Sequence, residues 1–176
     1  MRRIAVVGSS GSGKTTMAAT LAKRLGLAHI ELDAIFHQPD WQQLDGDEFS
    51  RRVEAATEVE GWTLCGNYSK IDHIRFGRAD TVVWLDYAKP VVISRLVRRT
   101  VRRAVTREEL WNGNREPITN FTSWDPDKNV IRWSWVNFDR RRETYERHAD
   151  SGSWDHLTVH RFTRPADADT WLEHIR

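Results

Sequence analysis

Short runs of apolar, mostly β-branched residues recur along the chain and predict the strands of a buried sheet. The runs are residues 3–7, 29–32, 62–65, 81–85 and 156–162. The first stops at Gly8, the second at Asp33, the third at Gly66 and the fourth at Asp86. Continuous apolar runs, without alternation of polar residues, are typical of strands covered on both faces in a parallel sheet.

Helical spacing appears between these runs. Met17, Leu21 and Leu25 lie four residues apart and are followed by Gly26, a residue that commonly ends helices. Further helices are expected over 47–58, from Lys89-Pro90 onward, over 129–148 and over 167–175. Strands that alternate with helices predict a doubly wound parallel α/β sheet. We expect one domain, residues 1–176, with an acceptor-side insertion at 34–61 and a lid-like segment at 104–130.

The first loop carries the most specific motif of the chain. Residues 8–15 (GSSGSGKT) match G-x-x-x-x-G-K-[ST] between a strand and a helix, which is the context of a phosphate-binding P-loop. Glycines let successive backbone N–H groups point at phosphates, the lysine reaches the β- and γ-phosphates, and the threonine hydroxyl is placed for Mg²⁺. The nucleotide-binding residues expected here are Gly8, Ser9, Ser10, Gly11, Ser12, Gly13, Lys14, Thr15 and Thr16.

Two aspartates end strands on the rim where open α/β sheets bind ligands. Asp33 can take a proton from an acceptor hydroxyl or hold Mg²⁺ through water; the alternative is a cap for a short helix at 34–37. Asp86 is a second metal candidate, or again a helix cap. Thr15, Asp33 and Asp86 therefore form the expected metal set.

Aromatic, amide and cationic side chains follow on the same rim and are expected to contact an acceptor. These residues are Phe36, Trp41, Gly66, Asn67, Tyr68, Arg75, Trp111 and Arg115, with Asp33. Each has a plainer interpretation: local packing for Trp41, a strand-ending turn for 66–68, a solvated cation for Arg75 and a self-folded loop for 109–116. The sequence leaves these alternatives open.

A block rich in arginine follows the fourth strand. Arg95, Arg99, Arg102 and Arg103 fall on one face of the expected helix, and guanidinium groups over a nucleotide stabilise transferring phosphoryl charge. A lid over the phosphates is the favoured interpretation; a nucleic-acid surface and a solvated helix are the alternatives. Lys14, Asp33, Arg99 and Arg103 form the expected catalytic set.

Composition narrows the class of protein. The net charge is only +2 and no apolar run approaches the roughly 18 residues of a membrane span, so a nucleic-acid coat is disfavoured, though not excluded, and a membrane protein is not expected. Cys65 is the single cysteine, which fits a reducing cytoplasm. A strand pattern from residue 3 leaves no room for a signal peptide. A monomer or a homodimer is expected.

The motifs GSSGSGKTT, ELDAIF, GNY, ADTVVWLD, RLVRRTVRR, ELWNGNRE and HRFTRPADADTWL span nearly the whole chain. Together they resemble the adenylate-kinase-like branch of P-loop kinases, and more narrowly the small bacterial proteins labelled adenylate kinase, P-loop kinase or DNA topology modulation protein. The resemblance implies a three-layer sandwich with a five-stranded parallel sheet of order 2-3-1-4-5. It also implies that Arg95 stacks on adenine, that Arg99 contacts phosphates, and that Arg164, Pro165 and Ala166 cup the adenine.

One segment departs from that pattern. Adenylate kinases carry Asp-Gly-Phe-Pro-Arg after the third strand, whereas residues 65–69 here read Cys-Gly-Asn-Tyr-Ser, without the aspartate and the arginine. This argues against AMP as the acceptor. The sequence thus predicts an ATP- and Mg²⁺-dependent phosphotransferase acting on a nucleoside, nucleotide or related small molecule; the alternative is an ATP-binding regulatory or nucleic-acid-associated protein with slow hydrolysis.

Overall fold

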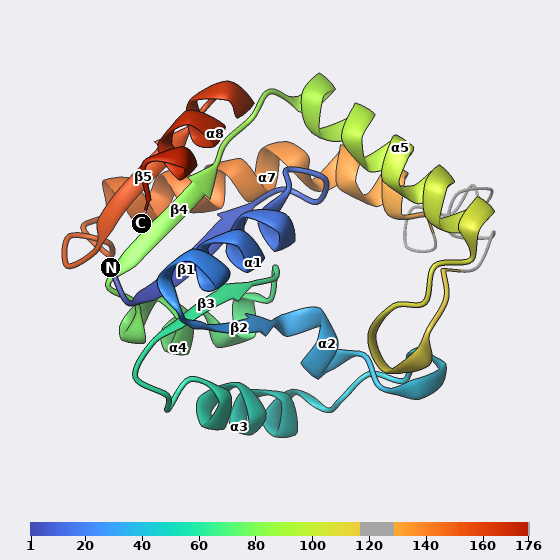
Figure 1. Cartoon of the computed structure of the whole chain (residues 1–176), viewed down its shortest axis with the longest axis horizontal. Coiled ribbons are helices and arrows are strands. Elements are labelled where there is room, and N and C mark those ends of the chain that lie inside the picture. Colours follow the sequence, from blue (N-terminus) through green and yellow to red (C-terminus); the bar gives the residue numbers. More distant parts are fainter. Residues whose placement is uncertain (117–128, 176) are drawn as a thin grey trace.

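The computed structural model describes residues 1–116 and 129–175 and contains a five-stranded, fully parallel sheet (Figure 1). The strands are β1 (Arg3–Gly8), β2 (Ala28–Glu31), β3 (Trp62–Cys65), β4 (Thr81–Leu85) and β5 (Thr158–Phe162). Their spatial order is β2-β3-β1-β4-β5. The predicted α/β fold class and the order 2-3-1-4-5 are therefore confirmed.

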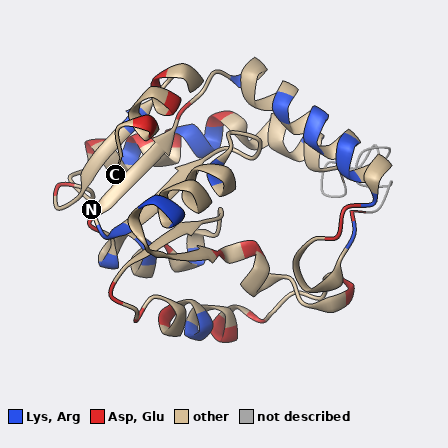
Figure 2. Cartoon of the chain, viewed as in Figure 1, with Lys and Arg blue, Asp and Glu red and all other residues tan. Residues whose placement is uncertain are grey.

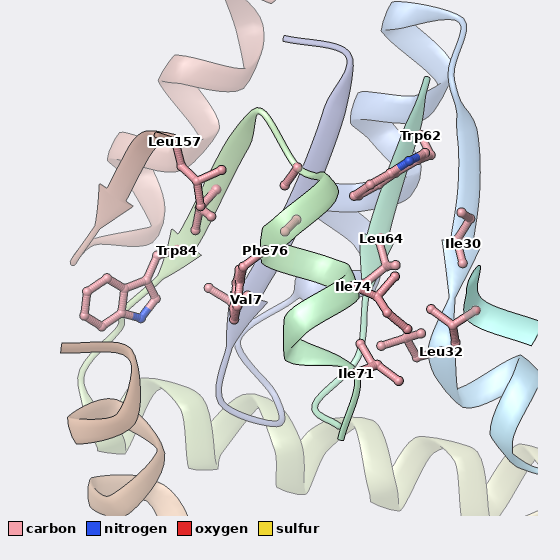
Figure 3. Close-up of a cluster of buried hydrophobic side chains, with 14 of the residues drawn as sticks. Val7, Ile30, Leu32, Trp62, Leu64, Ile71, Ile74, Phe76, Trp84 and Leu157 are labelled. Carbon is pink, nitrogen blue, oxygen red and sulfur yellow. The ribbon is translucent and has the colours of Figure 1, made fainter. Parts of the chain in front are cut away.

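Helices cover both faces of the sheet, because the buried strand β1 presents apolar side chains to each side. Ile4 and Val6 pack with residues of α1 (Lys14–Leu25), α5 (Lys89–Thr106) and α8 (Pro165–Glu173). Ala5 and Val7 pack with residues of α3 (Gly46–Ala56), α4 (Asp72–Arg78) and α7 (Val130–Asp150). Figure 3 shows the second of these clusters, with Trp62, Leu64 and Trp84 projecting from β3 and β4. The result is a three-layer sandwich.

Element boundaries differ from the sequence expectation by one to two residues at most positions. β2 ends at Glu31, because Leu32 already starts the short helix α2 (Leu32–Phe36). α3 begins at Gly46, since the Asp45 side chain accepts hydrogen bonds from the N–H groups of Asp47 and Glu48 at 2.9 and 3.2 Å and caps the helix. Three 3₁₀ turns complete the described elements: η1 (Pro39–Trp41), η2 (Ser69–Ile71) and η3 (Trp111–Gly113).

The segments after α2 and after α5 lie at the carboxyl end of the strands, whereas α3, also part of the 34–61 insertion, packs beside the sheet (Figure 1). α5 extends past the sheet, and the chain after it returns to the segment that follows α2 (Figure 1). Residues 117–128 of the predicted lid-like segment 104–130 lie outside the described residues. Within the described residues, none of the helices has the length and apolar character needed to cross a membrane.

Candidate active site

The loop between β1 and α1 has the backbone of a phosphate-binding loop. Gly8, Gly11 and Gly13 all have positive φ, at 147°, 91° and 98°, a region that side chains rarely enter. A Cβ at Gly11 would lie 2.5 Å from the carbonyl oxygen of Val92, so the loop packs directly on the backbone of α5. The glycines are therefore required both for the curl of the loop and for its contact with the arginine helix.

Lys14 is the lysine of this loop, and the charges of two arginines and one aspartate act on it. Its Nζ donates a hydrogen bond to the Ser9 carbonyl oxygen at 3.0 Å. Burial, and after it the charge of Arg141, lower the pKa of Lys14 to about 7; Arg99 acts in the same direction and Asp33 opposes it. A bound anion would offset the positive charges of Lys14 and these arginines, so the arrangement suits the phosphates of a nucleotide.

The hydroxyl of Thr15 faces a carboxylate that sequence reasoning did not single out. Thr15 Oγ1 donates to Glu31 Oε1 at 3.1 Å, and Asp33 follows Glu31 by two residues. The signal was present as a Glu-x-Asp pair at a strand end. Oxygen ligands of this type suit Mg²⁺, which keeps waters and phosphate oxygens as its other ligands. Among the described residues, no three or more His, Cys, Asp or Glu side chains form a cluster that could hold a metal ion.

Cys65 lies next to Thr15. Its Sγ is 3.9 Å from Thr15 Oγ1, and burial, with Glu31 next in weight, raises the pKa of the thiol to about 12. The thiol is therefore protonated and unreactive at neutral pH.

Asp33 is held on the acceptor side by an aromatic hydroxyl. The Tyr68 hydroxyl donates to Asp33 Oδ1 at 2.6 Å and lies 3.4 Å from His37 Nε2. Burial, followed by Asp33, raises the pKa of Tyr68, and burial lowers that of His37, so both stay neutral at pH 7. The N-cap residue of α2 is Glu31, not Asp33, so the plainer interpretation of Asp33 as a helix cap is wrong.

Three arginines of α5 face the site at intervals of four residues. Arg95 Nη1 lies 3.5 Å from the Ser12 carbonyl oxygen, and its guanidinium is 5.5 Å from the Tyr87 ring. Arg99 has a buried Nε without a hydrogen-bond partner, and burial, with Arg103 next, lowers its pKa. Arg103 is mostly buried, with ion pairs of 3.8 Å to Glu108 and 3.6 Å to Glu116.

Arg102 does not share this face, contrary to expectation. Its side chain is exposed and pairs with Glu108 at 2.8 Å, because successive residues of a helix are about 100° apart and Arg102 is turned away from the side on which the next residue, Arg103, is buried. Figure 2 shows the positions of the Lys and Arg residues along α5 and α7. Arg141 of α7, and not Arg102, is among the arginines whose charge acts on Lys14. It lies in the run Arg140–Arg142, and the sequence alone does not show which of the three faces the loop.

Asp86 is engaged by two arginines. Its buried carboxylate accepts hydrogen bonds from Arg161 Nε and Nη2 at 2.9 and 2.6 Å and from Arg142 Nη2 at 3.2 Å. It does not cap α5, whose N-cap residue is Ala88. Two adjacent positive charges disfavour a bound cation, so we leave Asp86 out of the proposed metal set.

Arg75 is buried rather than solvated, which corrects its expected place beside an acceptor. Its Nη1 donates to the Gly66 carbonyl oxygen at 2.6 Å, and Nη2 pairs with Asp72. Gly66 itself has φ 136°, and a Cβ there would lie 2.5 Å from Leu32 Cβ. Asn67 Oδ1 accepts from the Tyr145 hydroxyl at 3.2 Å. These contacts hold the loop after β3 in place beneath Tyr68.

The two insertions contact each other through a set of hydrogen bonds that we call the clasp, formed by residues 34–42 and 111–115. Asn112 Nδ2 donates to the carbonyl oxygens of Ala34 (3.1 Å) and His37 (2.5 Å). The Asn114 amide bonds to Gln38 and to the backbone N–H of Trp41.

Ring contacts accompany these bonds. Trp41 Nε1 donates to the Arg115 carbonyl oxygen at 3.0 Å, and the rings of His37 and Trp111 stack 6.0 Å apart. The loop at 109–116 is thus packed against the acceptor-side insertion rather than only on itself.

The predicted adenine-binding residues lie at the start of α8. Arg164 forms a two-point ion pair with Asp167 at 2.9 and 3.1 Å, and Pro165 is the first residue of α8. Ala166 follows within the same helix. Their contact with adenine stays a prediction.

The sequence of the chain is similar to those of two kinds of kinase. No family model matches the chain. Shikimate kinase from Synechococcus sp. (strain RCC307) is 29% identical over 111 residues, which are 52% of this chain and 54% of that protein. Adenylate kinase 1 from Nostoc sp. (strain PCC 7120) is 29% identical over 194 aligned residues, covering 87% of this chain and 100% of that protein.

The fold is also found among solved structures. Shikimate kinase from Bacteroides thetaiotaomicron superposes with a TM-score of 0.54 at 16% identity, covering 98% of this chain and 94% of that chain. The match to the Synechococcus protein spans about half of that protein's length. The chain is thus distantly similar in sequence to adenylate kinase and to shikimate kinase, and it has the five-stranded α/β fold of such kinases.

Proposed function

We propose that the protein is an ATP-dependent phosphotransferase that acts on a small molecule. The observation that carries this proposal is that the P-loop lysine experiences the charges of Arg99 and Arg141, while the Asp33 carboxylate, held by Tyr68, lies at the same edge of the sheet. The first group fits the transferring phosphates and the second fits an acceptor hydroxyl.

The residues divide the reaction between them. Lys14, Arg99, Arg103 and Arg141 bind the β- and γ-phosphates and stabilise charge that spreads over the transferring oxygens. Thr15, with Glu31 through water, would hold Mg²⁺, which would neutralise phosphate charge. Arg95 lies beside the loop where the nucleoside part of ATP would follow its phosphates.

The transfer step forms one bond to phosphorus and breaks another. The acceptor hydroxyl oxygen forms a bond to the γ-phosphorus while the bond from that phosphorus to the bridging oxygen of ADP breaks. The hydroxyl proton passes to Asp33 and from there to water. Tyr68 orients the carboxylate through its 2.6 Å hydrogen bond. Packing of the clasp over the rim would limit access of water, which competes as acceptor.

ADP release tests the proposal. A panel of nucleosides, nucleoside monophosphates, sugars and amino-alcohol antibiotics should contain a compound that raises ATP turnover well above the rate with ATP alone. A slow rate that no compound changes, but that DNA or RNA alters with a steep dependence on salt, would instead establish a nucleic-acid-associated ATPase.

Two variants test the roles of residues. Lys14→Ala should lower turnover by at least about 100-fold with the fold intact, whereas Lys23→Ala, an exposed lysine of the same helix, should leave it unchanged. Asp33→Asn should lower turnover by about 100- to 10,000-fold with nearly unchanged ATP affinity. Collapse of ATP affinity in Asp33→Asn would assign that residue to the metal and not to the acceptor.

A further inference from the structure

The site has two walls of opposite charge. On the phosphate wall, burial lowers the pKa values of Lys14 and Arg99, and neighbouring arginines lower them further: Arg141 and Arg99 act on Lys14, and Arg103 acts on Arg99. Asp33 opposes both shifts, and Arg95 Nη1 lies 3.5 Å from the Ser12 carbonyl oxygen of the P-loop. An anionic donor fits this wall.

The acceptor wall is negative. The Asp33 carboxylate lies 2.6 Å from the Tyr68 hydroxyl, and its charge, with that of Glu31, raises the pKa of Tyr68 beyond the effect of burial. Asp33 also acts to raise the pKa of His37, against burial. The polar groups on this wall are thus one carboxylate, one neutral phenol and one neutral imidazole.

Cations near this wall are already engaged by other groups. Arg75 donates to the carbonyl oxygens of the loop below Tyr68 and pairs with Asp72. Lys70 pairs with Asp47 at 2.8 Å, and Arg115 lies 3.7 Å from a Glu109 carboxylate oxygen. An acid placed against Asp33 would meet its charge without a counter-charge from these three groups. Lys14 and Arg99 also act on Asp33, but the phosphates of bound ATP would engage them.

Aromatic rings form the rest of the wall. Phe36 lies between His37 and Tyr68, with ring centroids 5.2 and 4.7 Å away. Trp41 and Trp111 continue the row, each half-buried and in ring contact with His37. Half-buried rings offer flat apolar surface to a ligand, and their faces favour neutral or cationic groups over anions.

We propose that the phosphoryl acceptor is a hydroxyl compound without negative charge, with a flat or apolar face that packs against these rings. This rests on the proposed function. A hydroxyl oxygen requires a base, which Asp33 supplies, whereas the oxygen of a phosphate ester is already anionic and would be repelled by that carboxylate. The acceptor class thereby differs from adenylate and from shikimate, which are both acids.

Matched pairs of compounds test the charge of the acceptor directly. We would measure kcat/KM for ADP release, with saturating ATP and Mg²⁺, using adenosine and AMP, guanosine and GMP, and thymidine and TMP. Shikimate would be added as an acid, and streptomycin as a cationic hydroxyl compound. At least one neutral or cationic compound should be phosphorylated with a kcat/KM ten or more times that of its phosphate or of shikimate.

The outcomes separate the two proposals. Preference for a monophosphate or for shikimate would overturn this inference and leave the proposed phosphotransferase standing. If no compound raised the rate of ADP release, the result would count against the proposed function and against the inference that rests on it.

A second measurement tests the negative wall without an acceptor. The pKa of His37, followed by NMR, should fall in Asp33→Asn, because the carboxylate that raises it is lost. His160, whose pKa is lowered by burial alone, should not respond. An unchanged His37 would overturn the charge argument.

Discussion

Asn114 offers the sharpest test of the clasp between the two insertions. Its side chain is almost fully buried, at 4% exposure, and all of its hydrogen-bonding groups are used. Oδ1 accepts from the Trp41 backbone N–H at 2.8 Å, and Nδ2 donates to the carbonyl oxygens of Gln38 and Trp111, both at 2.9 Å. Asn114→Ala removes the three bonds together.

The magnitude follows from these contacts. A buried neutral hydrogen bond contributes about 1 kcal/mol net, and the bonds of Asn114 to Gln38 and to Trp41 are the two that cross the clasp, so their loss should cost about 2 kcal/mol. Because 1.36 kcal/mol corresponds to a factor of ten, opening of the clasp should become about 30-fold more frequent.

Hydrogen exchange at the Trp41 amide measures this opening. Asn114→Asp keeps the acceptor for that amide and loses the donor, so it should fall between Asn114→Ala and the wild type. Asn137→Ala is the matched control, because the Asn137 amide bonds only to Trp133 within its own helix. Unchanged exchange at Trp41 in Asn114→Ala would refute the reasoning, and an equal loss of global stability in urea would show that the clasp does not open as a separate unit.

Three further predictions concern the loop and the ion pairs. Folding lowers the pKa of Lys14 from 10.5 to about 7, so its contribution to the free energy of unfolding should rise with pH between these values. Bound phosphates favour the protonated lysine, so ATP affinity should fall above pH 7 and binding should take up a proton. Calorimetry in buffers of different ionisation enthalpy measures this uptake, and Lys14→Arg should abolish both effects. Absence of proton uptake at pH 8 would contradict the lowered pKa. Gly11→Ala should cost about 2 kcal/mol or more in urea unfolding, because φ is +91° and the added Cβ meets the backbone of α5, whereas Gly77→Ala, in open space on α4, should stabilise by up to about 1 kcal/mol. Equal effects of the two would exclude backbone strain at the loop. Asp86→Asn should lower the free energy of unfolding by about 2 kcal/mol, which is less than the roughly 3–5 kcal/mol of a fully buried pair, because its arginine partners are partly exposed. Asp139 is an exposed carboxylate, so Asp139→Asn should lower it by less than about 1 kcal/mol. A changed Mg²⁺ requirement in Asp86→Asn would return that residue to the metal site.

The sequence by itself determined the parts of this protein whose physical cause is local. The P-loop is eight contiguous residues, and its glycines, lysine and threonine act through the backbone that joins them. The buried strands are read from apolar runs, because covering both faces of a strand requires apolar side chains at every position. The spacing of Arg95, Arg99 and Arg103 likewise follows from the helical repeat.

Only the tertiary structure decided which charged groups are free to act. Asp86 follows a strand just as Asp33 does, yet it is bound by arginines from α7 and β5. Glu31 joins the site through its hydrogen bond with Thr15, and Arg141 of α7 acts on the charge of Lys14. Whether a charge is paired depends on partners far away in the chain, and a sequence pattern that extends over a few residues carries no information about them.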